Sequence, residues 1–180
     1  IQGFFDMPVD NLFTTPLFAK YIKGKFKSKN LICVSPDVGG VQRTRGLATR
    51  IKADLAIIDK RRPRPGQSKV MNIIGNVKGK TCIIVDDIID SGGTIVNAVD
   101  ALKKEGALDV YVFITHAVLS GEAILKIKKS KIKKLIITDT IDNTKKIKNN
   151  NKIQVLSISS LMAEAIKRIS NSTSVSDLFN

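Results

Sequence analysis

The sequence predicts an α/β fold, with a mostly parallel sheet that carries helices on both faces. Its expected strands are short continuous apolar runs, not alternations of apolar and polar residues, which is typical of strands covered on both faces. Segments with apolar residues at helical spacing alternate with these runs, which indicates a parallel sheet. With 180 residues, 43% of them hydrophobic, the chain is long enough to bury a core as one domain.

A lead-in segment opens the chain. We expect residues 1–26 to form this segment together with a first helix that starts at about Thr15, and residues 27–180 to form the domain itself. The first residue is Ile1 and not methionine, so a fragment or a processed product is expected.

Apolar runs bounded by polar or glycine residues give the expected strands. The clearest read LICVS from residue 31, LAII from residue 55, VYVFIT from residue 110 and LIIT from residue 135. The expected strands cover residues 31–35, 55–58, 70–74, 81–85, 110–115, 135–138 and 153–156.

Helical patterns lie between these strands. One follows Gly40 and runs to about Lys52, and another covers 94–104 and ends before Gly106. The expected helix over 157–169 begins in a serine-rich cap region. A further helix is expected over 121–129, and the polar stretch 144–152 is expected as a surface loop.

Composition limits the classes of partner. The net charge of +14 suggests nucleic acid, but the excess is mostly lysine and only 5% of residues are aromatic, so stacking platforms are scarce. We therefore expect anionic small molecules such as phosphates, and no nucleic acid. No apolar run approaches the ~20 residues of a membrane span, so no membrane is expected either. Cys33 and Cys82 each lie inside an apolar run and are expected as buried free thiols of a cytoplasmic protein.

The most informative stretch reads VDDIIDSGGT over residues 85–94. Asp86 and Asp87 follow an apolar strand, and ligands bind beyond the carboxyl ends of strands in open α/β sheets. The glycine-rich turn that follows supplies backbone N–H groups at a helix N-terminus, where an anion is favoured. Adjacent carboxylates suit a polyhydroxyl such as ribose, and the turn suits its phosphate. The residues of this cradle are Asp86, Asp87, Asp90, Ser91, Gly92, Gly93 and Thr94.

A plain turn that only caps a helix is the alternative interpretation. A generic turn rarely carries three aspartates in five positions directly after a buried strand, which favours binding. Asp90 suits an anion cradle only if its carboxylate caps the turn or holds a sugar hydroxyl.

A second candidate site is the basic loop that starts KRRPR at Lys60. It leaves the end of a strand, so it is expected at the same sheet edge as the acidic turn. Such a loop can stabilise negative charge that develops in phosphoryl transfer. A solvated loop or a localisation-type signal is the alternative, and spacing alone does not decide between them.

A third candidate is the turn SPDVGG, which again joins a strand end to a helix. Asp37 in this turn is a candidate Mg²⁺ ligand, because Mg²⁺ takes few protein carboxylates and keeps waters and phosphates. A helix N-cap is the alternative role for Asp37.

These three segments, with QGFFD at residues 2–6 and VMNI at residues 70–73, resemble the ribose-phosphate pyrophosphokinase family. The resemblance extends to the closing SVSDLF and implies a type I phosphoribosyltransferase-like fold. Ser91 stands where the family commonly has threonine, which keeps the hydroxyl. Members have two similar α/β domains, and this chain resembles the second domain and the segment before it.

The resemblance implies an enzyme that uses Mg²⁺ to transfer the diphosphoryl group of ATP to the C1 hydroxyl of ribose 5-phosphate. Lys60 and Arg62 are then the catalytic cations, and Asp37 is the metal ligand. Residues 90–94 hold the 5-phosphate, and Asp86 with Asp87 holds the ribose hydroxyls. The resemblance also implies a homo-oligomer, commonly a hexamer in the family.

Two other functions share parts of this pattern. A phosphoribosyltransferase would share the acidic motif but is not expected to carry the basic loop together with SPDVGG. A non-catalytic associated subunit would more readily lose the loop cations or the acidic residues. Because nucleotide-binding residues in the family come largely from the first domain and a neighbouring subunit, the isolated chain is expected to bind ribose 5-phosphate with little or no turnover.

Overall fold

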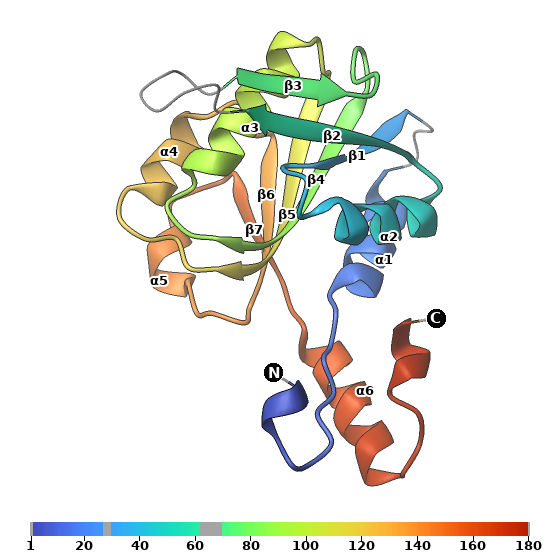
Figure 1. Ribbon diagram of the computed structural model, residues 1–180. Helices are drawn as coiled ribbons and strands as arrows, with labels where there is room; N and C mark the ends of the chain where they lie inside the picture. The colour runs from blue at the N-terminus through green and yellow to red at the C-terminus, as the bar shows by residue number, and fades with distance from the viewer. Residues whose placement is uncertain (1, 27–29, 62–69, 180) are drawn as a thin grey trace.

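Within the described residues, the computed structural model has one sheet of seven strands in the order β3-β2-β1-β4-β5-β6-β7 (Figure 1). The structure describes residues 2–26, 30–61 and 70–179. Neighbouring strands are parallel except for β2 and β3, which are antiparallel. The strands are β1 Leu31–Ser35, β2 Asp54–Arg61, β3 Val70–Ile74, β4 Thr81–Ile89, β5 Asp109–Ala117, β6 Lys134–Thr138 and β7 Ile153–Leu156. This architecture confirms the predicted α/β class with a mostly parallel sheet.

Helices lie on both faces of the sheet. Residues of α1 and α2 pack on one face, and residues of α3 and α4 pack on the other. The α-helices are α1 Thr15–Lys25, α2 Val41–Ile51, α3 Gly93–Lys104, α4 Ala123–Lys129, α5 Thr144–Ile147 and α6 Ser159–Ser170. Among the described residues, none of these helices has the length and apolar character needed to span a membrane.

Burial on both faces explains the continuous apolar runs. Side chains of successive strand residues point to opposite faces. Ile83 therefore packs in the cluster with α1 and α2, whereas Ile84 packs in the cluster with α3 and α4. Both are fully buried. Cys33 and Cys82 are also buried free thiols, in opposite clusters, as predicted.

Several elements differ from the sequence prediction, including β5, which runs to Ala117 instead of ending at residue 115. Strand β4 continues to Ile89 instead of ending at residue 85, because β5 also continues and pairs with it as far as Ala117. Asp86 and Asp87 thus lie in the last part of the strand and not beyond it. Strand β2 likewise runs to Arg61, because β3 pairs with it as a hairpin. The expected loop at 144–152 contains the one-turn helix α5.

The first residues and the last helix extend together away from the sheet (Figure 1). The segment before α1 meets the C-terminal 3-10 helix Ser176–Phe179 through Phe13 and Phe179. The rings of Phe13 and Phe179 meet edge to face with centroids 5.4 Å apart. The side chain of Arg50 on α2 donates a hydrogen bond to the backbone oxygen of Phe179. The C-terminal segment is thereby attached to the helix that leaves β1.

Gly75 gives a stability prediction for the edge hairpin. It has φ +117°, and a Cβ at this position would lie 2.9 Å from Ala56 Cβ and 3.1 Å from Ala56 Cα on β2. Gly79 also has positive φ, +69°, but a Cβ there would meet nothing within 4 Å. We predict that Gly75→Ala lowers the free energy of unfolding by roughly 1–3 kcal/mol more than Gly79→Ala, because only Gly75→Ala adds a clash to the backbone strain. Urea unfolding of the two variants measures the difference, and equal losses would contradict the steric explanation.

Candidate functional site

The candidate residues lie where the strand order reverses. From β1 the chain passes through α2 to β2 on one side, and from β4 it passes through α3 to β5 on the other side. Helices α2 and α3 cover opposite faces, so their N-termini diverge at the carboxyl ends of the adjacent strands β1 and β4. Such a switch point is where open α/β sheets bind ligands.

Asp86 and Asp87, here called the acidic pair, meet a cation from α2. Arg43 NH1 donates to Asp86 Oδ1, and Arg43 NH2 donates to Asp87 Oδ2 at 2.9 Å. The Asp86 side chain is 18% exposed and that of Asp87 is 57% exposed. One guanidinium thus joins two neighbouring carboxylates of different burial.

Burial raises the pKa of Asp86 above its ordinary value. Two contacts lower the pKa of Asp86: the Asp87 backbone N–H, which donates to Asp86 Oδ1 at 3.0 Å, and the positive charge of Arg43. The nearby Asp87 carboxylate raises the pKa further. The net effect is a raised pKa, so the site disfavours the ionised form of Asp86 relative to an exposed aspartate.

The glycine turn after β4 leads directly into α3. Gly92 has φ +76°, in the left-handed region that glycine adopts most easily, and α3 begins at the next residue. No side-chain hydrogen bond caps α3 at Gly92. Asp90, Ser91 and Thr94 are exposed around the turn. The turn therefore presents first-turn backbone amides and hydroxyl groups, a combination suited to a phosphate.

Asp37 closes the turn that leads into α2, but the N-cap residue of that helix is Gly40 and not Asp37. Its Oδ1 accepts the backbone N–H of Gly40 at 2.9 Å, at the N-terminus of α2. Ser35 Oγ donates to the backbone oxygen of Asp37 at 2.6 Å, which closes the same turn. A Cβ on Gly40 would lie 2.9 Å from Ser35 Oγ, so a larger residue there would require the Ser35 hydroxyl to shift.

A Mg²⁺ ion would therefore have to share Asp37 with this turn. The described part of the chain contains no group of three or more histidine, cysteine, aspartate or glutamate side chains that could hold a metal ion. A single carboxylate is nevertheless compatible with Mg²⁺, which keeps several waters and binds substrate phosphates. Metal binding at Asp37 remains a prediction.

The basic loop starts at the expected edge of the sheet. Strand β2 is parallel to β1, and its residue Ile57 is level with Ser35, the last residue of β1. From there β2 continues to Arg61, past the end of β1, at the edge of the sheet where the carboxyl ends of β1 and β4 lie. Lys60 is the penultimate residue of β2, and its side chain lies outside the described part of the chain, as does all of Arg62. Their catalytic roles therefore remain predictions.

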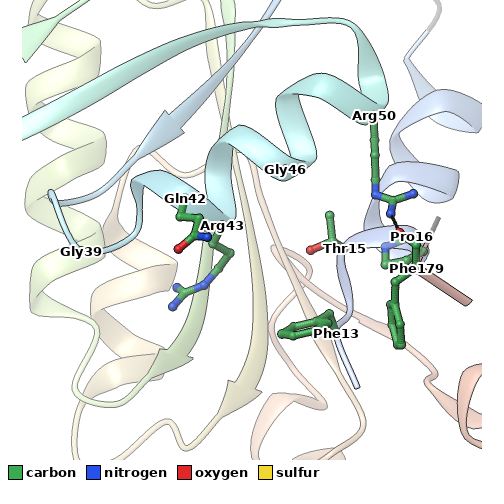
Figure 2. A pocket seen from close by; sticks show the side chains of 9 residues that line it. All are labelled: Phe13, Thr15, Pro16, Gly39, Gln42, Arg43, Gly46, Arg50 and Phe179. Carbon is green, nitrogen blue, oxygen red and sulfur yellow. Dashed lines mark hydrogen bonds between the residues drawn. The ribbon is translucent and has the colours of Figure 1, made fainter. Parts of the chain in front are cut away.

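Sequence reasoning missed Arg43. One signal could have revealed it. Arg43 is a cation in the first turn of α2, where the helix dipole disfavours positive charge, and that turn contains no acidic residue. Figure 2 shows Arg43 and Gln42 at the start of α2 and Arg50 at its end, around a cavity of about 510 Å³. A second cavity of about 250 Å³ also includes Arg43, together with Asp87 and His116. Arg43 thus stands between two cavities at the switch point.

His116 has a hydrogen-bond partner at the same edge. Its Nδ1 lies 3.1 Å from Thr140 Oγ1, and Thr140 Oγ1 also donates to the backbone oxygen of Thr115 at 2.9 Å. These contacts connect the ends of β5 and β6.

The pKa of Asp86 gives a prediction for stability. Because the folded pKa lies above the ordinary value of 3.8, the folded state binds the proton more tightly, and the Asp86 contribution to stability falls as pH rises from about 3.8 through the folded pKa. We predict that Asp86→Asn raises Tm at pH 7 and that the gain shrinks as pH falls toward 4. Asp87→Asn, at the more exposed position, should change Tm less. Thermal unfolding at pH 4 and pH 7 tests this, and a lower Tm for Asp86→Asn at pH 7 would show that the Arg43 contact outweighs desolvation.

Comparison with known proteins gives matches that cover all or nearly all of this chain. A ribose-phosphate pyrophosphokinase of Bradyrhizobium diazoefficiens is 57% identical over 180 residues, which is 100% of this chain and 57% of that protein. The crystal structure of phosphoribosylpyrophosphate synthetase from Mycobacterium smegmatis superimposes with a TM-score of 0.86 at 37% identity, over 95% of this chain and 55% of that one. This chain therefore spans little more than half the length of these relatives.

More distant matches concern the fold alone. A crystal structure of adenine phosphoribosyltransferase matches with a TM-score of 0.56 at 19% identity, over 68% of this chain and 76% of that chain. These matches confirm the type I phosphoribosyltransferase-like fold. The family model described as the phosphoribosyl synthetase-associated domain matches residues 60–180, about two thirds of the chain. The chain belongs to the phosphoribosyl synthetase-associated domain family.

Proposed function

We propose that this chain supplies the ribose 5-phosphate site and the basic catalytic loop of a ribose-phosphate pyrophosphokinase. The reaction transfers the diphosphoryl group of ATP to the C1 hydroxyl of ribose 5-phosphate, giving 5-phosphoribosyl 1-diphosphate and AMP. The observation that carries the proposal is the acidic pair near the end of β4, with the left-handed Gly92 and the start of α3 in the turn that follows this strand. The names of relatives that are 57% and 55% identical over the whole chain support the same reaction.

Each part of the cradle has its own role in this proposal. The backbone amides of residues 91–94 bind the 5-phosphate, favoured by the dipole of α3. The Ser91 and Thr94 hydroxyls donate to the same phosphate. Asp86 and Asp87 accept hydrogen bonds from the ribose hydroxyls and so fix the orientation of C1. Asp90 lies at the rim, where its carboxylate can accept from a sugar hydroxyl but not from the phosphate.

The basic loop acts on the other substrate. Lys60 and Arg62 stabilise negative charge that develops on the diphosphoryl group while the C1 oxygen forms a bond to the β-phosphorus and the bond to the α-phosphate oxygen breaks. The described part of β2 extends past the end of β1 as far as Arg61, at the edge where the cradle is proposed, which supports this role for the loop. Protein side chains form no covalent intermediate in this scheme, so positioning and charge provide the rate.

Mg²⁺ belongs to the same proposal. Asp37 would hold it, with the remaining positions taken by water and phosphate oxygens. Bound there, Mg²⁺ would neutralise phosphate charge. Binding of ATP and assembly into a homo-oligomer, a hexamer in the family, are likewise proposed.

Ribose 5-phosphate binding is the first test. We predict saturable binding to the 180-residue chain by calorimetry, much tighter than binding of ribose or inorganic phosphate, because only the complete ligand fills both halves of the cradle. Asp87→Asn should weaken binding about tenfold or more, equivalent to about 1.4 kcal/mol. Asp54→Asn removes a carboxylate at the opposite end of the sheet and should leave binding unchanged. No binding by the unsubstituted chain would overturn the proposal.

Turnover is the second test. In the full-length gene product, Lys60→Ala and Arg62→Ala should each lower kcat for AMP formation by about 100-fold or more, while Lys128→Ala, an exposed lysine on α4, should not. The Tm of all three variants should stay close to that of the parent. Wild-type kcat in Lys60→Ala would remove the catalytic assignment. Consumption of 5-phosphoribosyl 1-diphosphate with a nucleobase, and no AMP formation from ATP, would indicate a phosphoribosyltransferase instead.

A further inference from the structure

Arg43 connects α2 to the acidic pair across the switch point. Its two terminal nitrogens donate to different carboxylates, NH1 to Asp86 and NH2 to Asp87. The Arg43 side chain is 33% exposed and borders both cavities of the site. It is therefore half-buried against the pair that we assign to the sugar.

The position of Arg43 is not explained by the helix that carries it. It lies in the first turn of α2, where the positive end of the helix dipole disfavours a cation, and that turn contains no acidic residue. The two carboxylates of β4 compensate for this cost. Arg43 therefore serves the site and not the helix.

The contacts of Arg43 occupy the atoms that a sugar needs. Asp86 Oδ1 accepts from Arg43 and from the Asp87 backbone N–H, and Asp87 Oδ2 accepts from Arg43. Asp87 Oδ1 accepts from the backbone N–H of Ile88 at 2.9 Å. Three of the four carboxylate oxygens thus accept hydrogen bonds before any ligand is bound. Ribose hydroxyls that donate to Asp86 Oδ1 or Asp87 Oδ2 would share these two oxygens with the guanidinium, whereas Asp87 Oδ1 is shared only with a backbone N–H.

We propose that Arg43 is a counterion that exchanges partners during the reaction cycle. In the free site it neutralises the acidic pair, and when ribose hydroxyls take its place it turns to the phosphoryl groups of the second substrate. This inference rests on the proposed function, since it assumes that the acidic pair binds the sugar.

Two physical reasons support the exchange. A guanidinium stays charged at every accessible pH, and a half-buried one needs an anionic partner when it leaves the first. Its planar fork fits the oxygens of a phosphate as well as those of a carboxylate. The cavity along α2, bounded by Gly39, Gln42 and Gly46 beside Arg43, provides space for the side chain to turn (Figure 2). Sugar binding would thereby release a positive charge for the diphosphoryl group.

The experiment separates exchange from simple support of the acidic pair. We compare Arg43→Gln, Arg43→Lys and the control Arg45→Gln, which makes the same change at an exposed position of the same helix. The Kd for ribose 5-phosphate is measured by calorimetry at pH 8, and kcat and KM are measured in the full-length gene product. For Arg43→Gln we expect ribose 5-phosphate to bind at least as tightly as to the unsubstituted chain, because its competitor is gone, while kcat falls about 100-fold. Arg43→Lys should recover about tenfold of that loss, and Arg45→Gln should match the parent in every value.

Other results would overturn the exchange of partners by Arg43. If Arg43→Gln weakens ribose 5-phosphate binding tenfold or more and leaves kcat unchanged, Arg43 only supports the pair and the inference is overturned. An unchanged kcat with unchanged binding overturns it equally. If Arg43→Gln does not fold, Arg43→Lys decides by the same split between Kd and kcat. Absence of ribose 5-phosphate binding by the unsubstituted chain contradicts the proposed function itself, which distinguishes the two failures.

Discussion

The reversal of strand order between β1 and β4 is the constraint on which the site depends. Because β1 is followed by α2 on one face and β4 by α3 on the other, the two adjacent strands end in an opening that neither helix covers. Backbone amides at the start of α3, the turn at the start of α2 and the acidic pair all face this opening from different elements. The apolar core that fixes the strands, with residues such as Ile83 and Ile84 buried on opposite faces, therefore also fixes the distances between the polar groups at its edge.

Charge at this edge is arranged at a cost to the fold. Asp86 is partly buried and carries a pKa raised by desolvation, next to a second carboxylate. Arg43 stands at the unfavourable end of its helix and compensates for both carboxylates. Arrangements of this kind are common at functional sites, where strained electrostatics is retained because a ligand relieves it. A polyhydroxyl would donate hydrogen bonds to both carboxylates, and a nearby anion would pair with Arg43, so all three charged groups would have partners.

Much of the fold followed from the apolar runs, since burial on both faces leaves a direct trace in the sequence. The ends of the strands did not. Polar side chains at Asp86 and Asp87 suggested that β4 stops at residue 85, but strand pairing depends on backbone groups, and β5 continues to offer them. The polar, basic residues at the end of β2 predict a loop for the same reason, whereas pairing with β3 extends the strand to Arg61. The cradle residues are predicted from local motifs. Arg43 is not, because its partners lie 43 and 44 positions away in the sequence.

We propose that ribose 5-phosphate binds across the acidic pair and the start of α3. NMR titration of the ¹⁵N-labelled chain tests this placement most directly. The largest shift changes are expected at the backbone amides of residues 91–94 and 86–88, together with a change at the Arg43 side-chain Nε–H signal as its carboxylate partners are taken by the sugar. Inorganic phosphate should change the chemical shifts of the backbone amides of residues 91–94 only. Saturable changes confined to other surfaces, such as the lysine-rich face of α4, with the β4–α3 turn unaffected, would contradict this placement of the ligand.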